Sequence, residues 1–173
     1  MKQFSVLLIP LALLACSPAP DAGGPEADAA APPSPYAFEV NLTLTPRAAE
    51  KLAATKERVI VDASYFGPAV SATAPGVDDH GMEVWLGGDM IEVDPVNARV
   101  KAPGTGFDPT NIASITGEPE VLVNVYSARK THTDNIISCG IYQGPVKMAQ
   151  QKPVEIRCDL IYDENGNPLP PPN

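Results

Sequence analysis

The amino-acid sequence predicts a mainly β protein: a single β-sandwich, immunoglobulin-like or transthyretin-like in outline, with one short helix after the first strand. This expectation has three sources. Residues 38–45, FEVNLTLT, alternate strictly between apolar and polar side chains, which is the period-2 pattern of a half-buried strand. Further short runs rich in β-branched residues follow along the chain. Long segments rich in proline and glycine separate these runs, as in domains built from strands and turns.

A helix is expected directly after the first strand. Thr45 is suited to be its N-cap, and Pro46 fits the first helical position, where a missing N–H costs nothing. The helix is predicted to end near Lys56. Its apolar stripe consists of Ala49, Leu52 and Ala53.

The middle of the chain contains the next strand candidates. A glycine pair, Gly87-Gly88, divides the β-rich run 82–93 and predicts a hairpin. A glycine bulge within one long strand is the competing interpretation. The hairpin would place on one face, as cross-strand neighbours, the side chains of Glu83, Trp85, Met90 and Glu92. Other strands are predicted at 58–66, 98–101, 112–116 and 120–128, with a long loop at 67–81.

Two further strands carry cysteines. In NIISCGIY, Cys139 shares the apolar phase with Ile137 and Ile141, and in PVEIRCDLIY, Cys158 shares it with its apolar neighbours. Both thiols are therefore expected to point into the core. A disulfide between them would stabilise the domain by ~3 kcal/mol. A reduced pair that only packs is the alternative.

The N-terminal segment has the pattern of a processing signal. Lys2 gives a positive start, and the apolar run that follows is too short for the ~20 residues of a membrane span. The run ends in Leu-Leu-Ala-Cys at residues 13–16. This ending resembles the lipobox of bacterial lipoproteins, which implies cleavage before Cys16 and attachment of diacylglycerol to its thiol.

That resemblance implies three parts of the chain and a location. Residues 1–15 would be the signal peptide, residues 16–35 the lipidated cysteine with a Pro/Ala-rich tether, and residues 36–173 the β-sandwich domain. Ser17, in place of an aspartate, implies export to the outer membrane, with the domain on the periplasmic side. In a Gram-positive organism the location would be the outer face of the plasma membrane. The odd number of cysteines, 3, also fits, because lipidation of Cys16 leaves an even pair.

Charge limits the choice of partners. The chain has 12 basic and 21 acidic residues, and losing Lys2 with the leader takes the net charge from −9 to about −10. Because the basic residues are scattered, nucleic acid is not expected as a partner. The expected partners are the membrane, through the N-terminal lipid, and a protein or cell-wall component.

Candidate chemistry is sparse. The chain contains no hydrolase, metalloprotease or phosphate-binding motif, so we expect no enzyme and no cofactor. The 2 histidines offer weak candidates for a copper or zinc site. That site would need the loop 78–82 to meet the loop 132–134, and its candidate ligands are Asp78, Asp79, His80, Met82, His132 and Asp134.

The leading functional hypothesis is a lipid-anchored, non-enzymatic binding or accessory domain. Its candidate interface consists of Glu83, Trp85, Met90 and Glu92, since tryptophan and methionine are enriched at interfaces. One alternative is an inhibitor of a basic cell-wall hydrolase such as lysozyme, for which the acidic domain provides electrostatic steering. The other alternative is periplasmic binding of copper or zinc.

Overall fold

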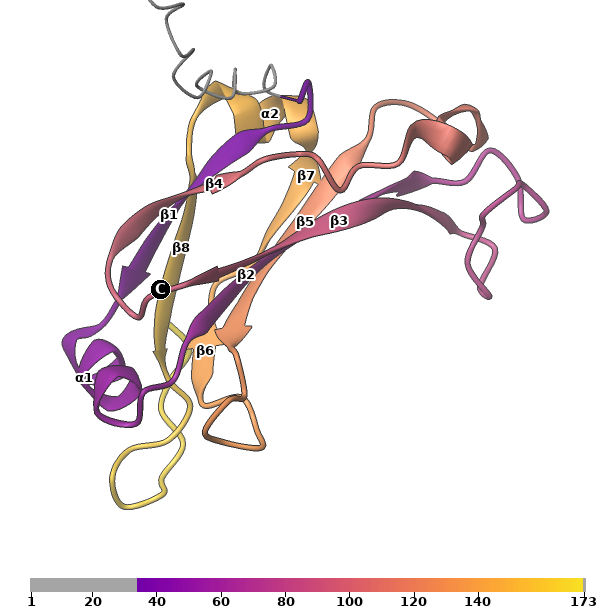
Figure 1. The fold of residues 1–173 in the computed structure, drawn as a ribbon. Helices are drawn as coiled ribbons and strands as arrows, with labels where there is room; N and C mark the ends of the chain where they lie inside the picture. Colours follow the sequence, from indigo (N-terminus) through magenta and orange to yellow (C-terminus); the bar gives the residue numbers. More distant parts are fainter. Residues whose placement is uncertain (1–33, 173) are drawn as a thin grey trace, which may run out of the picture. The chain divides into compact units, whose positions relative to one another are not determined.

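The computed structural model describes residues 34–172 (Figure 1). The predicted signal peptide, Cys16 and all but the last two residues of the segment 16–35 lie outside the described residues. The elements in chain order are β1 (Phe38–Leu44), α1 (Pro46–Ala54), β2 (Val59–Pro68), β3 (Glu83–Val93), β4 (Ala98–Ala102), the 3-10 helix η1 (Pro109–Ser114), β5 (Glu120–Ser127), β6 (Ile137–Cys139), β7 (Tyr142–Pro145), α2 (Val146–Gln151) and β8 (Val154–Leu160).

The strands form two four-stranded sheets that pack face to face, which confirms the predicted β-sandwich. Sheet A has the strand order β4-β1-β8-β6, and sheet B has the order β3-β2-β5-β7. Neighbouring strands are antiparallel except for β1 and β8, which run parallel. The first and last strands therefore lie side by side in the middle of sheet A.

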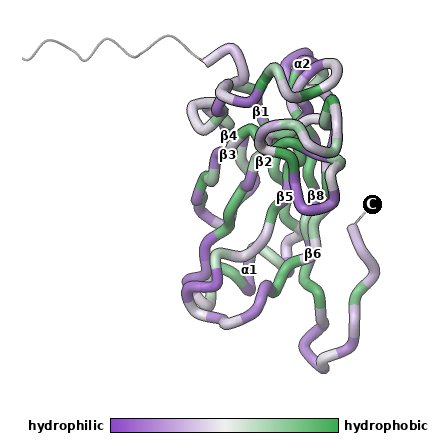
Figure 2. Tube along the Cα trace, turned by 90° about the vertical axis from the view of Figure 1, so that its right-hand side faces the viewer, coloured by the Kyte–Doolittle hydropathy of each residue, from purple (hydrophilic) through white to green (hydrophobic). Residues whose placement is uncertain are grey.

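The core lies between the two sheets and follows from period-2 alternation. In β1 the predicted apolar set is buried, and the residues between are only partly covered. The inward residues of β2 and β5 face this set across the sandwich. Figure 2 shows the hydrophobic stretches running along these strands. Each large apolar side chain buried here contributes ~1.5–3 kcal/mol.

Helix α1 begins as the sequence predicts. The Thr45 hydroxyl accepts a hydrogen bond from the N–H of Ala48, and Pro46 takes the first helical position. The helix ends at Ala54, and Ala48 and Leu52 are buried against the core. A second short helix, α2, was not predicted, because it spans only one to two turns and has no side-chain cap.

The hairpin predicted at Gly87-Gly88 is wrong. β3 is one continuous strand that pairs with β2 along its length, with a shift in register where Ser64 lies opposite Gly88 and Phe66 lies opposite Trp85. Two residues of β3 thus oppose one residue of β2, which is a β-bulge. Gly87 has φ +94°, and a Cβ there would lie 2.0 Å from the carbonyl oxygen of Gly106. The close approach of the Gly106 backbone therefore explains why a glycine stands here, and no chain reversal is involved.

The strand predicted at 112–116 is also wrong. Asp108 is the N-cap of η1, because its side chain accepts a hydrogen bond from the N–H of Thr110, and Pro109 is the first residue of the helix. The segment is therefore helical up to Ser114, and Ile115 follows it. Ile115 is buried and forms an isolated bridge with Ala69. The apolar residues of this segment follow a turn rather than a strand face.

The cysteine-containing run 135–142 is divided between the two sheets. β6 ends at Cys139, and β7 begins at Tyr142 in the other sheet, so Ile141 lies exposed between them and not in the core as expected. Cys139 and Cys158 lie directly opposite each other on β6 and β8 and are joined by a disulfide, with 4.0 Å between their Cα atoms. Cys158 is buried and Cys139 is partly covered. Within the described part of the chain, no helix is long and apolar enough to cross a membrane.

Candidate binding face

The outward side of sheet B is unusually apolar for a surface that faces solvent. Strands β2 and β5 alternate, so every second residue points away from the core. We call this surface the sheet B face. It consists of Ile60, Asp62, Ser64, Phe66, Trp85, Met90, Leu122, Asn124 and Tyr126, with Glu83, Glu92 and Glu120 at its margin.

The bulge decides which residues of β3 join this face. In a regular strand, Trp85 and Met90 would point to opposite sides, because they are an odd number of positions, five, apart. The extra residue at Gly87 shifts the alternation, and the observed burial of β3 is inward at Val84, Leu86 and Asp89. The four interface candidates Glu83, Trp85, Met90 and Glu92 therefore share the outward side, as expected, although through a bulge and not a hairpin.

Trp85 and Met90 are the most accessible apolar groups on the face, at 58% and 69% exposure. On β2, Phe66 opposite Trp85 and Ile60 opposite Glu92 point the same way but are only 9% and 8% exposed. The Trp85 ring lies over the backbone of Gly88, because its Cζ2 and Cη2 atoms come within 3.5 Å of where a Cβ would stand. The indole thus lies along the strand and covers part of the sheet.

The polar groups within the face are connected to one another. The Asp62 carboxylate accepts hydrogen bonds from the Ser64 hydroxyl at 3.2 Å and from the Tyr126 hydroxyl at 3.5 Å. Burial and the nearby Asp62 carboxylate raise the pKa of Tyr126. The Arg129 guanidinium lies 5.7 Å from the Tyr126 ring centre, within cation–π range.

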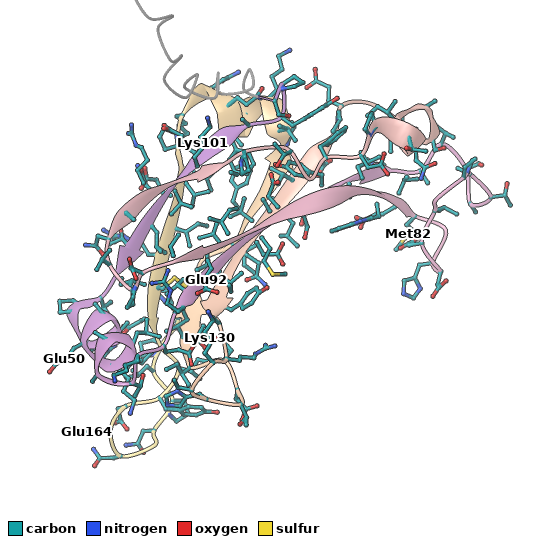
Figure 3. The ribbon with its side chains drawn as sticks, in the orientation of Figure 1. Glu50, Met82, Glu92, Lys101, Lys130 and Glu164 are labelled. Carbon is teal, nitrogen blue, oxygen red and sulfur yellow. A yellow bond between two sulfur atoms is a disulfide. The ribbon has the colours of Figure 1, made fainter. Side chains whose placement is uncertain are left out.

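The two ends of the face differ in charge pairing. At one end, Glu92 accepts from Lys130 Nζ at 2.5 Å and from Arg58 Nε at 3.1 Å. These cations lower the pKa of Glu92, Lys130 through its hydrogen bond most of all. At the other end, Glu83 and Glu120 take part in no ion pair with any described residue. Figure 3 shows Glu92 close to Lys130 and Met82 at the opposite end of β3.

A buried carboxylate that the sequence analysis missed holds the loop after β5. Glu57 is 1% exposed and accepts hydrogen bonds from the N–H groups of Arg58, Lys130 and Thr131 and from the Thr131 hydroxyl. Burial by itself would raise its pKa, but these hydrogen bonds outweigh it and lower the pKa to about 2. Nothing in the local sequence marks Glu57 for this role, since all its donors except Arg58 come from more than seventy residues away.

A second buried carboxylate, Asp89, closes the free edge of β3. It accepts from the Tyr65 hydroxyl at 2.9 Å and from the N–H groups of Gly104 and Gly106 at 2.7 and 2.8 Å. Burial and the bond to Asp89 raise the pKa of Tyr65 above its ordinary value. The loop 104–107 is thereby fixed against the bulge, and the sheet edge is covered.

The structure does not bring the two histidines together. His80 lies in the loop between β2 and β3, at the Pro68 end of β2. His132 lies in the loop after β5, whose last residue, Ser127, pairs with Val59 at the other end of β2. The length of β2 separates the two loops by ~30 Å. His132 lies beside Glu57, with its Nδ1 3.7 Å from Oε2. Among residues 34–172 no three His, Cys, Asp or Glu side chains come together in a group that could hold a metal.

An open groove of about 670 Å³ lies at the α1 end of the domain. Lys51, residues 131–136, Leu160 and Tyr162–Glu164 line it. In the described part of the chain no buried side-chain polar atom lacks a hydrogen-bond partner. Among the described residues, the groove therefore offers no buried polar side chain with an unsatisfied hydrogen bond that a ligand could complete.

Comparison with known proteins finds no matching family model, no matching curated protein and no matching solved structure.

Proposed function

We propose that this protein is a lipid-anchored, non-catalytic protein of the bacterial envelope whose β-sandwich binds a protein partner through the sheet B face. The observation that carries the proposal is the exposure of Trp85 and Met90 on a sheet face whose outward side also presents Phe66, Ile60 and Leu122. Large exposed apolar side chains on one face are typical of an interaction site.

The outward side of sheet A, which we call the sheet A face, provides the internal reference. Its outward positions on β1, β4, β6 and β8 are all polar: Glu39, Asn41, Thr43, Arg99, Lys101, Ser138, Glu155, Arg157 and Asp159. Some charges there are paired, for example Arg99 Nη1 with Glu39 Oε2 at 3.5 Å. Folding of the sandwich therefore does not require an apolar outward face, and the residues of the sheet B face need a separate explanation.

The proposed location rests on the N-terminal sequence. The lipobox-like ending at Cys16 supports lipid attachment, and Ser17 supports the periplasmic side of the outer membrane. Two or three acyl chains bind a membrane almost irreversibly, since each buried CH₂ contributes ~0.8 kcal/mol. A tethered domain that stays at the membrane is well placed to recruit or hold a partner.

The anchor is tested by Cys16→Ser in the full-length chain. We expect the protein to leave the membrane fraction while its melting temperature stays unchanged, because the segment between Cys16 and the domain contains no large apolar residue that could pack. Fractionation with high-salt and carbonate washes is the measurement. A Cys16→Ser protein that remains with the washed membranes would exclude lipid anchoring.

The face is tested by Trp85→Ala, with Lys101→Ala on the sheet A face as the matched exposed control. After envelope cross-linking and recovery of the full chain, we expect Trp85→Ala to reduce the yield of cross-linked partner about 30-fold, the cost of losing a central interface residue. Lys101→Ala should leave the yield unchanged. Equal yields from the wild type and both variants would exclude the sheet B face as the binding surface.

Inhibition of a basic cell-wall hydrolase is a second candidate, favoured by the net charge of −9. Its test is the rate of cell-wall lysis by lysozyme with and without an excess of the protein. An unchanged rate would exclude lysozyme as the target. Metal binding is not proposed, because the two histidine loops lie at opposite ends of β2.

A further inference from the structure

Lysine and arginine are absent from two long stretches of this chain. No Lys or Arg occurs between Arg58 and Arg99, or between Lys101 and Arg129. These two stretches contain β2, β3, β5 and the loops 69–82 and 103–119. The two loops lie together in space, since Ala69 bridges to Ile115 and Gly76 stands against Asn111. Lys147 of α2 reaches this end of the sandwich from outside the two stretches, 3.5 Å from Glu118.

Carboxylates are concentrated at the same end. Trp85, Phe66 and Glu120 lie side by side in one row across the sheet. Glu83 lies next to this row, on the same side of β3 as Trp85. Asp78 stands just beyond Glu83, and hydrogen bonds from the N–H groups of Met82 and Glu83 lower its pKa. The remaining carboxylates of this end are Asp79, Asp108 and Glu118, of which Glu118 has Lys147 3.5 Å away.

The opposite end of the sheet B face is neutralised by its own cations. Arg58 pairs with Glu92 and Asp94, and Lys130 pairs with Glu92. The negative field of the face is therefore concentrated around Trp85 and not around Lys130. Unpaired like charges repel one another, and a bound surface of opposite sign relieves that repulsion.

Exposed apolar residues lie at this acidic end too. Met82 and Val70 are exposed in and beside the loop 69–82, and Ile112 is partly exposed on η1. Trp85 adds the aromatic ring that binds Lys and Arg side chains best by cation–π contact. An apolar centre surrounded by carboxylates is complementary to a basic protein surface with an apolar centre, and it repels anionic lipid headgroups and nucleic acid.

We infer that the partner of this protein is a protein with a Lys/Arg-rich contact surface, and that it docks at the Trp85 end of the sheet B face. This inference rests on the proposed function and specifies the chemistry of its partner. It assigns Trp85 the apolar contact, and Glu83 and Glu120 the flanking charge contacts. Association should be faster and tighter at low salt, because these carboxylates are exposed to solvent.

The experiment uses the full-length chain in its own membranes, with a photo-reactive phenylalanine derivative placed at Met90 or, as the control, at Lys101. We expect a protein adduct from position 90 and none from position 101. In the position 90 protein, Glu83→Gln with Glu120→Gln should lower the adduct yield about tenfold. The matched pair Glu39→Gln with Glu155→Gln, on the sheet A face, makes the same change in net charge and should leave the yield unchanged.

The outcomes separate the two proposals. If position 90 gives a protein adduct whose yield is insensitive to salt and to Glu83→Gln with Glu120→Gln, the cationic partner is excluded while the proposed function stands. If both charge-neutralised pairs lower the yield equally, net charge and not this site is responsible, and the inference fails. If position 90 gives no adduct, gives a lipid adduct, or gives the same adduct as position 101, the proposed function fails and the inference with it.

Discussion

The sheet A face and the sheet B face show how one strand pattern produces two different surfaces. Both sheets alternate inward apolar residues with outward positions, and both contribute to one core. On sheet A the outward positions are polar and bond to one another; the Asn41 amide, for example, donates a hydrogen bond to Glu155 Oε1 at 2.7 Å. On sheet B they carry Phe66, Trp85 and Met90. Since the first arrangement suffices for folding, the second is best explained by binding.

The largest expected effect is on stability and concerns sheet A. Replacing both disulfide cysteines, Cys139→Ala with Cys158→Ala, should lower the free energy of unfolding by ~3 kcal/mol, because the bond closes a loop between residues 19 apart. The short strand β6 should loosen while the sheet B face keeps its structure. Urea denaturation gives the first quantity, and the yield of partner adduct from position 90 gives the second. A parallel loss of the adduct would show that the two faces are not independent.

The next effect concerns the bulge that shapes the sheet B face. Gly87→Ala should cost about 2 kcal/mol, since a positive φ penalises a Cβ and the backbone of Gly106 stands against it. Gly117→Ala is the matched control: it has φ +82° but nothing within 4 Å of the added Cβ, so it should cost ~1 kcal/mol. Urea denaturation measures both. Equal costs would mean that the contact with Gly106 contributes nothing.

A further effect appears only in acid. The pKa of Glu57 falls from an ordinary 4.5 to about 2 in the folded protein, and that of Asp159 falls from 3.8 to about 2. For Asp159 the hydrogen bond from Arg47 is the main cause. As the pH falls, these two carboxylates are protonated in the unfolded chain before they are protonated in the folded protein. The free energy of unfolding should therefore be at its full value above about pH 4.5 and should fall as the pH drops towards 2.

Variants assign this acid sensitivity to the two carboxylates. Glu57→Gln and Asp159→Asn should each start from a lower stability at pH 7 and lose less of it between pH 4.5 and pH 2 than the wild type does. Thermal denaturation across that pH range is the measurement. If both variants keep the full pH dependence of the wild type, other carboxylates are responsible.

The smallest expected effect is the cost in stability of the exposed residues themselves. Trp85→Ala and Lys101→Ala should each change the free energy of unfolding by only about 0.5 kcal/mol or less, since both side chains are exposed. Urea denaturation of the two variants measures this. If Trp85→Ala were as costly as a core truncation, of about 3 kcal/mol, its ring would be part of the packing, and its exposure would no longer favour an interface.

Sequence reasoning succeeded where the signal is local. Alternation identified β1 because burial every second residue follows from the geometry of a single strand. The Thr45-Pro46 pair identified the start of α1 because capping involves only neighbouring residues. The even pair of cysteines in the domain identified the disulfide, although the strand that carries Cys139 proved shorter than expected.

The sequence by itself determined the sandwich class, the first strand and the first helix. Only the tertiary structure decided the rest, because each remaining feature depends on a partner far along the chain. Gly87-Gly88 forms a bulge rather than a turn because β2 lies beside it and Gly106 lies against it. Glu57 becomes a buried, ionised carboxylate because the N–H groups of Lys130 and Thr131 surround it. The separation of charge along the sheet B face likewise exists only once β2, β3 and β5 lie side by side, with Arg58 and Lys130 at one end and Trp85 at the other.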